Sequence, residues 1–249
     1  MPSTLVLNSA VALAATMLAN NPAGSPPLGG PMSHVLVTVA GDQFFVGFEN
    51  ASLNPVALGT NVAGFEEEAA VLNRHGFNAQ YGWLVSGFWA PPPSASVWMR
   101  VVDQPEHLKT YIGRDYTVPG VASYTQFEPI LGTAGSVDRF AWNGTMLHNY
   151  TATQVLGTHE ATYEVYFGDA QGNVIPGSAA PAQVTLTFTF GTADPNGDGR
   201  VDIDDLYDWH QSRVDRDVDG DGAVTDLDGD LLMRTIRDGE RELMSSSRR

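Results

Sequence analysis

The chain has 249 residues and is acidic, with 29 Asp and Glu residues against 13 Lys and Arg residues and a net charge of −16. It contains no Cys, which excludes disulfides, thiolate metal sites and Cys nucleophiles. The basic patch that nucleic-acid-binding proteins carry is also missing, since Lys109 is the single Lys, so we expect no nucleic-acid partner.

The N-terminal segment predicts export. Residues 1–19 are mostly apolar but too short for a membrane span, and polar residues interrupt them. They are similar to the apolar region of a secretory signal peptide, with Ala19 at the cleavage point, although no Lys or Arg precedes Arg74. Residues 20–33 are rich in Pro and Gly and are predicted as a linker. We therefore expect a secreted or cell-surface bacterial protein with no stable membrane span.

Residues 34–192 have the pattern of a β domain. Two alternating apolar segments, 34–40 and 43–48, are separated by Gly41-Asp42 and predict a hairpin with a two-residue turn. Further strands are predicted at 81–88, 96–103, 137–142, 158–167 and 183–190. Residues 64–72 are the one helix-like interruption. Many short alternating strands favour a mainly β fold, an antiparallel β-sandwich.

Several residues of this domain have a structural and a functional interpretation. His148, His159 and Glu160 suggest a metal or acid–base site, but we favour strand-end histidines bonded to the backbone. The three consecutive residues Glu66 to Glu68 are better explained by a solvated first helical turn than by catalysis. The aromatic residues are expected in the core rather than on a sugar-binding surface. These are Trp83, Trp89, Trp98, Trp142, Tyr81, Tyr111 and Tyr116.

The most informative stretch, residues 194–228, contains two tandem loops of twelve residues. Both carry oxygen side chains at positions 1, 3 and 5, Gly at position 6, Val at position 8 and Asp at position 12. Positions 1, 3, 5, 7, 9 and 12 hold Asp194, Asn196, Asp198, Arg200, Asp202 and Asp205 in the first loop. They hold Asp217, Asp219, Asp221, Ala223, Thr225 and Asp228 in the second. This is the oxygen-ligand pattern of an EF-hand, with the position 7 carbonyl as a ligand, and it predicts two bound Ca²⁺ ions.

An apolar i, i+3, i+4 spacing follows each loop and predicts two helices that pack together. The first set is Ile203, Leu206, Tyr207, Trp209 and His210, and the second is Leu227, Leu231, Leu232 and Ile236. Val201 and Val224, at position 8, are expected to pair in a short β-bridge. We expect this calcium module to span residues 193–237 and to fold when metal binds, independently of the sandwich, and residues 238–249 to form a polar tail.

The two loops depart from the usual EF-hand pattern in two respects. Position 12 is Asp rather than Glu, and a strand rather than a helix precedes the first loop. In both respects the tandem loops resemble the type I dockerin, the calcium module of bacterial cellulosome-type enzymes. The resemblance implies calcium binding. It does not extend to cohesin recognition, since loop positions 10 and 11, often Ser-Thr in dockerins, are Ile203-Asp204 and Asp226-Leu227 here.

We interpret the chain as a secreted calcium-binding surface or assembly protein, a β-sandwich followed by a dockerin-like, EF-hand-like module. The alternative is a carbohydrate-active protein that binds polysaccharide or hydrolyses glycosides. Because no nucleophile or metal-hydrolase motif is visible, we expect no hydrolase activity. Two partner classes stay open: a cohesin-like or other cell-surface protein, and a polysaccharide.

Overall fold

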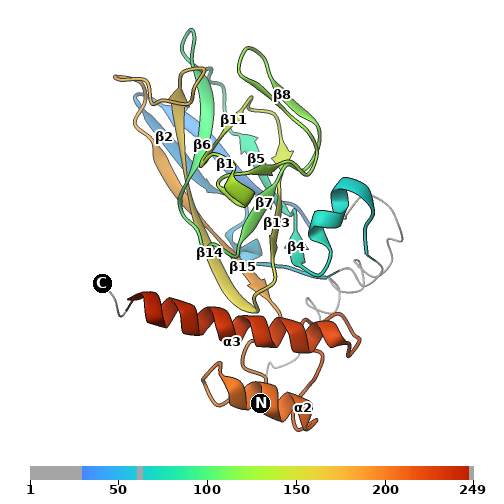
Figure 1. The fold of residues 1–249 in the computed structure, drawn as a ribbon. Helices are drawn as coiled ribbons and strands as arrows, with labels where there is room; N and C mark the ends of the chain where they lie inside the picture. The colour runs from blue at the N-terminus through green and yellow to red at the C-terminus, as the bar shows by residue number, and fades with distance from the viewer. Residues whose placement is uncertain (1–29, 61–63, 247–249) are drawn as a thin grey trace.

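The computed structural model describes residues 30–60 and 64–246 (Figure 1). Over these residues the protein is mainly β, with strands between Ser33 and Phe190 and two α-helices nearer the C-terminus. The predicted signal peptide and most of the predicted linker lie outside the described residues. No helix in the described ranges is long and apolar enough to cross a membrane.

The first sheet has the strand order β12–β5–β1–β2. Its strands are β1 (Ser33–Ala40), β2 (Gln43–Phe48), β5 (Tyr81–Val85) and β12 (Leu147–His148). The predicted hairpin is confirmed, because β1 and β2 pair antiparallel and Ala40 lies opposite Gln43 across the two-residue turn. Gly41 in that turn has a φ of +61°, a conformation that glycine adopts without a Cβ penalty.

A second, five-stranded sheet has the order β11–β6–β14–β15–β3. Its strands are β3 (Val56–Ala57), β6 (Ser96–Asp103), β11 (Arg139–Trp142), β14 (Gly157–Gly168) and β15 (Ala182–Phe190). The four longer strands confirm the predicted ones. The expectation of purely antiparallel pairing is wrong at two places, since β1 pairs parallel with β5 and β15 parallel with β3. Long connections separate both pairs, as parallel neighbours require.

Two smaller sheets complete the β domain, with the orders β10–β7–β13–β4 and β8–β9. Their strands are β4 (Gly76–Asn78), β7 (Lys109–Tyr111), β8 (Tyr116–Val118), β9 (Ala122–Tyr124), β10 (Pro129–Ile130) and β13 (Tyr150–Thr153). The 3₁₀-helices are η1 (Ala51–Leu53), η2 (Glu67–Leu72) and η3 (Thr133–Gly135). The helix expected at 64–72 is thus η2, and its first turn is solvent-exposed as predicted.

The two larger sheets contribute to one hydrophobic core. Ring pairs join them, with Phe44 and Phe167 at 4.6 Å between centroids and Trp83 and Tyr163 at 6.0 Å. The expected core role is confirmed for five of the predicted aromatic residues, which are at most 5% exposed: Tyr81, Trp83, Trp98, Tyr116 and Trp142. Trp89 and Tyr111 are half-buried and pack against buried clusters.

Two helices follow the strands, α2 (Ile203–His210) and α3 (Asp226–Ser246). Figure 1 shows α3 lying across the lower ends of β14 and β15, with α2 beneath it. Residues 238–246 were expected to belong to a polar tail but form the last turns of α3. Glu, Arg, Leu and Met in this stretch are good helix formers, so propensity extends the helix beyond its apolar face.

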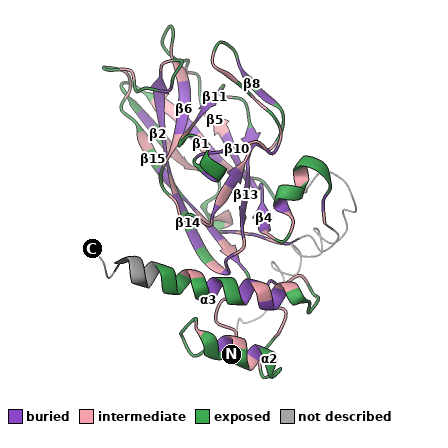
Figure 2. Cartoon of the chain, in the orientation of Figure 1, coloured by how far each residue is buried: buried purple, intermediate pink, exposed green. Residues whose placement is uncertain are grey.

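The predicted calcium module packs directly on the β domain. Trp209, Val218, Leu231, Leu232 and Ile236 belong to the same buried cluster as the strand residues, and buried and exposed positions follow one another along α3 (Figure 2). The expectation of a module with a core of its own is therefore wrong. Its apolar set is too small to close a core alone, and the strand ends supply the rest.

Hydrogen bonds accompany this packing. The Leu156 amide, between β13 and β14, donates to Thr235 Oγ1 of α3 at 2.8 Å. The Thr192 amide donates to the Val218 carbonyl at 2.7 Å. We call this contact between the β domain and residues 193–246 the seam.

Candidate metal centre

The two predicted calcium loops share one set of internal hydrogen bonds at equivalent positions. The position 5 and 6 amides donate to the position 1 carboxylate, Asp194 in loop 1 and Asp217 in loop 2, at 2.8–3.2 Å. The position 5 amide also donates to the position 3 side chain, Asn196 or Asp219. These hydrogen bonds hold the side chains of positions 1, 3 and 5 on the inner side of each loop.

The same set continues through the second half of each loop. The position 7 amides, of Arg200 and Ala223, donate to the position 5 carboxylates at 2.9 and 2.8 Å. The position 9 side chains, Asp202 and Thr225, accept from the position 11 amides at 2.9 and 3.1 Å and so cap the following helices.

Glycines allow these tight loops. Gly199 and Gly222 at position 6 have φ of +85° and +90°. Position 4 is also Gly in both loops, and Gly197 and Gly220 both have φ of +74°. The position 4 repeat is visible in the sequence and our sequence analysis missed it, although it adds to the match between the loops.

The position 12 carboxylates are the most deeply placed. Asp205 and Asp228 are 0% and 1% exposed. Each receives the position 9 amide of its own loop, at 2.9 and 2.7 Å. The other oxygen of Asp228 accepts from the Val218 amide at 2.9 Å. Burial raises the pKa of Asp205. A carboxylate held inward by backbone donors suits the position from which EF-hand loops complete their coordination.

Loop 2 brings three acidic side chains together. Carboxylate oxygens of Asp217, Asp219 and Asp221 lie within 4.8 Å of one another. Asp221 Oδ2 is shielded from solvent and has no hydrogen-bond partner of normal geometry among the described residues. Burial, with Asp221 and Asp228 nearby, raises the pKa of Asp219 to about 7. An oxygen-only cluster with an unpaired buried atom suits a hard cation such as Ca²⁺.

At positions 3 and 5, the residues of loop 1 are more exposed to solvent than those of loop 2. Asp198 and Arg200 are exposed, and Asp194, Asn196 and Asp202 are half-buried. Its position 3 side chain is the neutral Asn196, so loop 1 offers an amide oxygen where loop 2 offers a third carboxylate. The sequence shows this difference in charge, but it does not show the difference in burial.

The predicted β-bridge between Val201 and Val224 is absent from the described residues, where the isolated bridges lie elsewhere. The two side chains are 42% and 52% exposed. The module packs its apolar residues against the strands instead, so the loops are not joined back to back. Of the predicted helix faces, Trp209, Leu231, Leu232 and Ile236 are buried, whereas Ile203 and Tyr207 are exposed.

One residue at the metal centre comes from the β domain. Thr60, which follows β3, donates through its hydroxyl to Asp219 Oδ2 at 3.0 Å, and the two residues are 4% and 6% exposed. This hydroxyl lowers the pKa of Asp219, partly opposing burial. Because 159 residues separate Thr60 from Asp219, no local sequence pattern indicates their contact.

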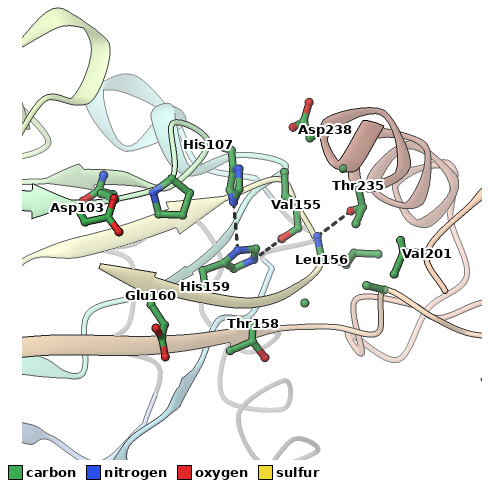
Figure 3. A pocket seen from close by; sticks show the side chains of 15 residues that line it. Asp103, His107, Val155, Leu156, Thr158, His159, Glu160, Val201, Thr235 and Asp238 are labelled. Carbon is green, nitrogen blue, oxygen red and sulfur yellow. Dashed lines mark hydrogen bonds between the residues drawn. The ribbon is translucent and has the colours of Figure 1, made fainter. Parts of the chain in front are cut away.

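A cleft of about 650 Å³ lies along the seam (Figure 3). Asp103, His107, His159 and Glu160 line its β-domain side, and Thr235 and Asp238 come from α3. His107 Nε2 and His159 Nδ1 are 3.1 Å apart, and His159 Nε2 lies 2.7 Å from the Val155 carbonyl. That carbonyl only accepts, so the proton of neutral His159 is on Nε2. Burial lowers the pKa of His107.

The predicted backbone role of the histidines is confirmed. His148 Nδ1 lies 2.7 Å from the carbonyl of Ala79, between β4 and β5, and His159 Nε2 lies 2.7 Å from the Val155 carbonyl. His159 pairs with His107, a partner that the sequence analysis did not name. Burial lowers the pKa of His148, which favours its neutral form.

Comparison of the chain with family models, with curated proteins and with solved structures gives no match.

Proposed function

We infer that the chain is a calcium-binding protein of the bacterial surface or of an extracellular assembly, in which the loops of residues 194–228 hold two Ca²⁺ ions. The observation that carries the proposal is the common hydrogen-bond set of the two loops. The two loop sequences differ at positions 2, 3, 7, 9, 10 and 11, yet positions 1, 3, 5 and 12 make the same hydrogen bonds within each loop.

The donor chemistry supports calcium over softer metals. The side chains at positions 1, 3, 5, 9 and 12 all offer oxygen, position 7 offers its backbone carbonyl, and the chain has no Cys. Ca²⁺ takes six to eight oxygens, whereas transition metals favour imidazole and thiolate ligands. The solvent-shielded Asp221 Oδ2 supports a bound cation as well, because a buried carboxylate oxygen without a partner is costly.

We extend the proposal to the architecture and role of the whole chain. The two larger sheets, which share one core, form a β-sandwich that the dockerin-like module accompanies. The Trp and Tyr residues considered for sugar stacking are buried or half-buried, which favours a structural or assembly role over polysaccharide binding through those rings. A cell-surface protein is then the partner class that suits the chain best.

The test is calorimetric titration of the full chain with Ca²⁺. We expect two binding events, loss of one in Asp194→Ala, loss of the other in Asp217→Ala, and loss of both in the double variant. Position 1 carries both the metal-binding carboxylate and the bonds that shape the loop, so its removal disables one loop at a time. A wild-type chain that takes up no Ca²⁺ at millimolar concentration would refute the proposal.

A further inference from the structure

The two loops have different surroundings. In loop 1 the position 3 residue Asn196 is half-buried and the position 5 residue Asp198 is exposed. Loop 2 lies against the β domain at the seam. Two of its residues bond to the β domain there, Val218 at position 2 and Asp219 at position 3, and Val218 also donates to Asp228 at position 12.

The side-chain contact joins a ligand position to the β domain. Thr60 donates to Asp219 Oδ2, and both residues are more than nine-tenths buried. A hydroxyl that donates to a carboxylate fixes the rotation of that carboxylate and leaves its other oxygen for a cation. The equivalent side chain in loop 1, Asn196, receives only the amide of its own loop within the described residues.

The backbone contact joins the loop to the end of β15. The Thr192 amide donates to the Val218 carbonyl, while the Val218 amide donates to Asp228 Oδ1. Val218 is 2% exposed and therefore links the position 12 carboxylate to the seam through its own peptide groups. Gly191 passes so close that a Cβ there would lie 2.2 Å from the Val218 carbonyl oxygen.

We propose that loop 2 is a calcium site shared between the module and the β domain, with Thr60 as the positioning residue for its position 3 ligand. Calcium in loop 2 then holds the seam closed, and the closed seam raises the affinity of loop 2 for calcium, because coupling between two equilibria is reciprocal. Loop 1 binds without this coupling. The inference rests on the proposed calcium function.

The test uses full-length chains in which one loop is disabled. In an Asp194→Ala background the remaining calcium event belongs to loop 2, and Thr60→Val should weaken it about tenfold, as expected for a hydrogen bond to a charged group. Thr60→Ser keeps the hydroxyl and should restore the affinity. In an Asp217→Ala background, Thr60→Val should leave the loop 1 event unchanged.

The outcomes separate the two proposals. Absence of any calcium event in the wild-type chain refutes the calcium function and this inference with it. Two normal events, with Thr60→Val changing both loops equally or neither, overturn the shared site and leave the calcium function intact.

A second measurement needs no variant. Hydrogen exchange of the Thr192 amide reports the seam directly, because its partner is the Val218 carbonyl. We expect exchange at least about tenfold slower in calcium than in chelator, since bound ligand reduces local opening. Equal exchange in the two conditions would contradict the coupling even if the Thr60 variants failed to fold.

Discussion

Position 3 shows how one residue distinguishes two otherwise similar loops. Asn196 and Asp219 accept the same amide bond from position 5, so both side chains have the same local geometry. Asp219 adds a negative charge in a place that solvent barely reaches. A cation offsets that charge, and without one the folded loop favours the protonated form.

This residue predicts an unusual pH dependence in chelator. The folded pKa of Asp219, about 7, is above the ordinary value of 3.8, so the carboxyl stabilises the fold below pH 3.8 and loses that contribution as the pH rises through about 7. We expect Asp219→Asn to raise the thermal unfolding midpoint at pH 8 and to change it little at pH 4.

Asp219→Asn gives loop 2 the position 3 side chain that loop 1 already has, Asn196. The exposed Asp226→Asn is the matched control for loss of one charge nearby and should show no such pH-dependent gain. A gain from Asp219→Asn that is equal at both pH values would contradict the assignment to this carboxyl.

At the scale of elements, α3 is the main connection between the module and the strands. Its Thr235 hydroxyl accepts from the Leu156 amide at 2.8 Å and donates to the Leu231 carbonyl at 2.9 Å. Thr235 is 7% exposed, so the amide has no ready access to water if the hydroxyl is removed. A buried hydrogen bond therefore joins α3 to the β domain, and apolar side chains pack around it.

We expect Thr235→Val, which keeps the shape and removes the hydroxyl, to lower the free energy of unfolding by about 1–3 kcal/mol, the cost of an unsatisfied buried donor. Thr235→Ser keeps the hydroxyl as donor and acceptor, so it should lower the free energy of unfolding less than Thr235→Val does. Denaturant unfolding followed by circular dichroism measures both. A Thr235→Val chain as stable as wild type would show that water reaches the Leu156 amide.

The elements also show what the sequence could and could not predict. The Gly41-Asp42 turn, the long alternating strands and the two loops depend on local patterns, and the structure has elements at each of those places. Strands of two to four residues, such as β12 and β13, are too short to show alternation. The parallel pairing of β1 with β5 and the contact of Thr60 with Asp219 depend on segments far apart in the chain. No short window of residues contains that information.

At the scale of the molecule, the continuous core predicts that both parts unfold together. Residues of α3 and of the strands share one buried cluster, so separating them exposes apolar surface on both sides. If the proposed calcium sites are occupied, the shared core predicts that metal stabilises the β domain as well as the module, in contrast to the sequence-based expectation of a β domain indifferent to metal. At a free calcium concentration of one hundred times Kd, each proposed site would contribute about 2.7 kcal/mol.

We expect a single thermal transition for the full chain that moves to higher temperature in calcium. Gly191→Ala should make it two transitions or remove much of the calcium shift, because the added Cβ meets the Val218 carbonyl at 2.2 Å. Gly177→Ala is the control, since its φ of +76° carries a similar backbone cost with no atom within 4 Å. Calorimetric scanning in calcium and in chelator measures both. The same number of transitions and the same calcium shift in Gly191→Ala and Gly177→Ala would contradict coupling across the seam.

The order of α3 after the strands has a consequence for biosynthesis. A ribosome makes the strands first, at about 5–20 residues per second, and makes α3 only after them. Until then the lower ends of β14 and β15 lack their apolar cover, and Leu156 lacks Thr235 as its partner. A chain truncated after Phe190 keeps that bare surface permanently, which makes it a substrate for the proteases that remove unfinished proteins.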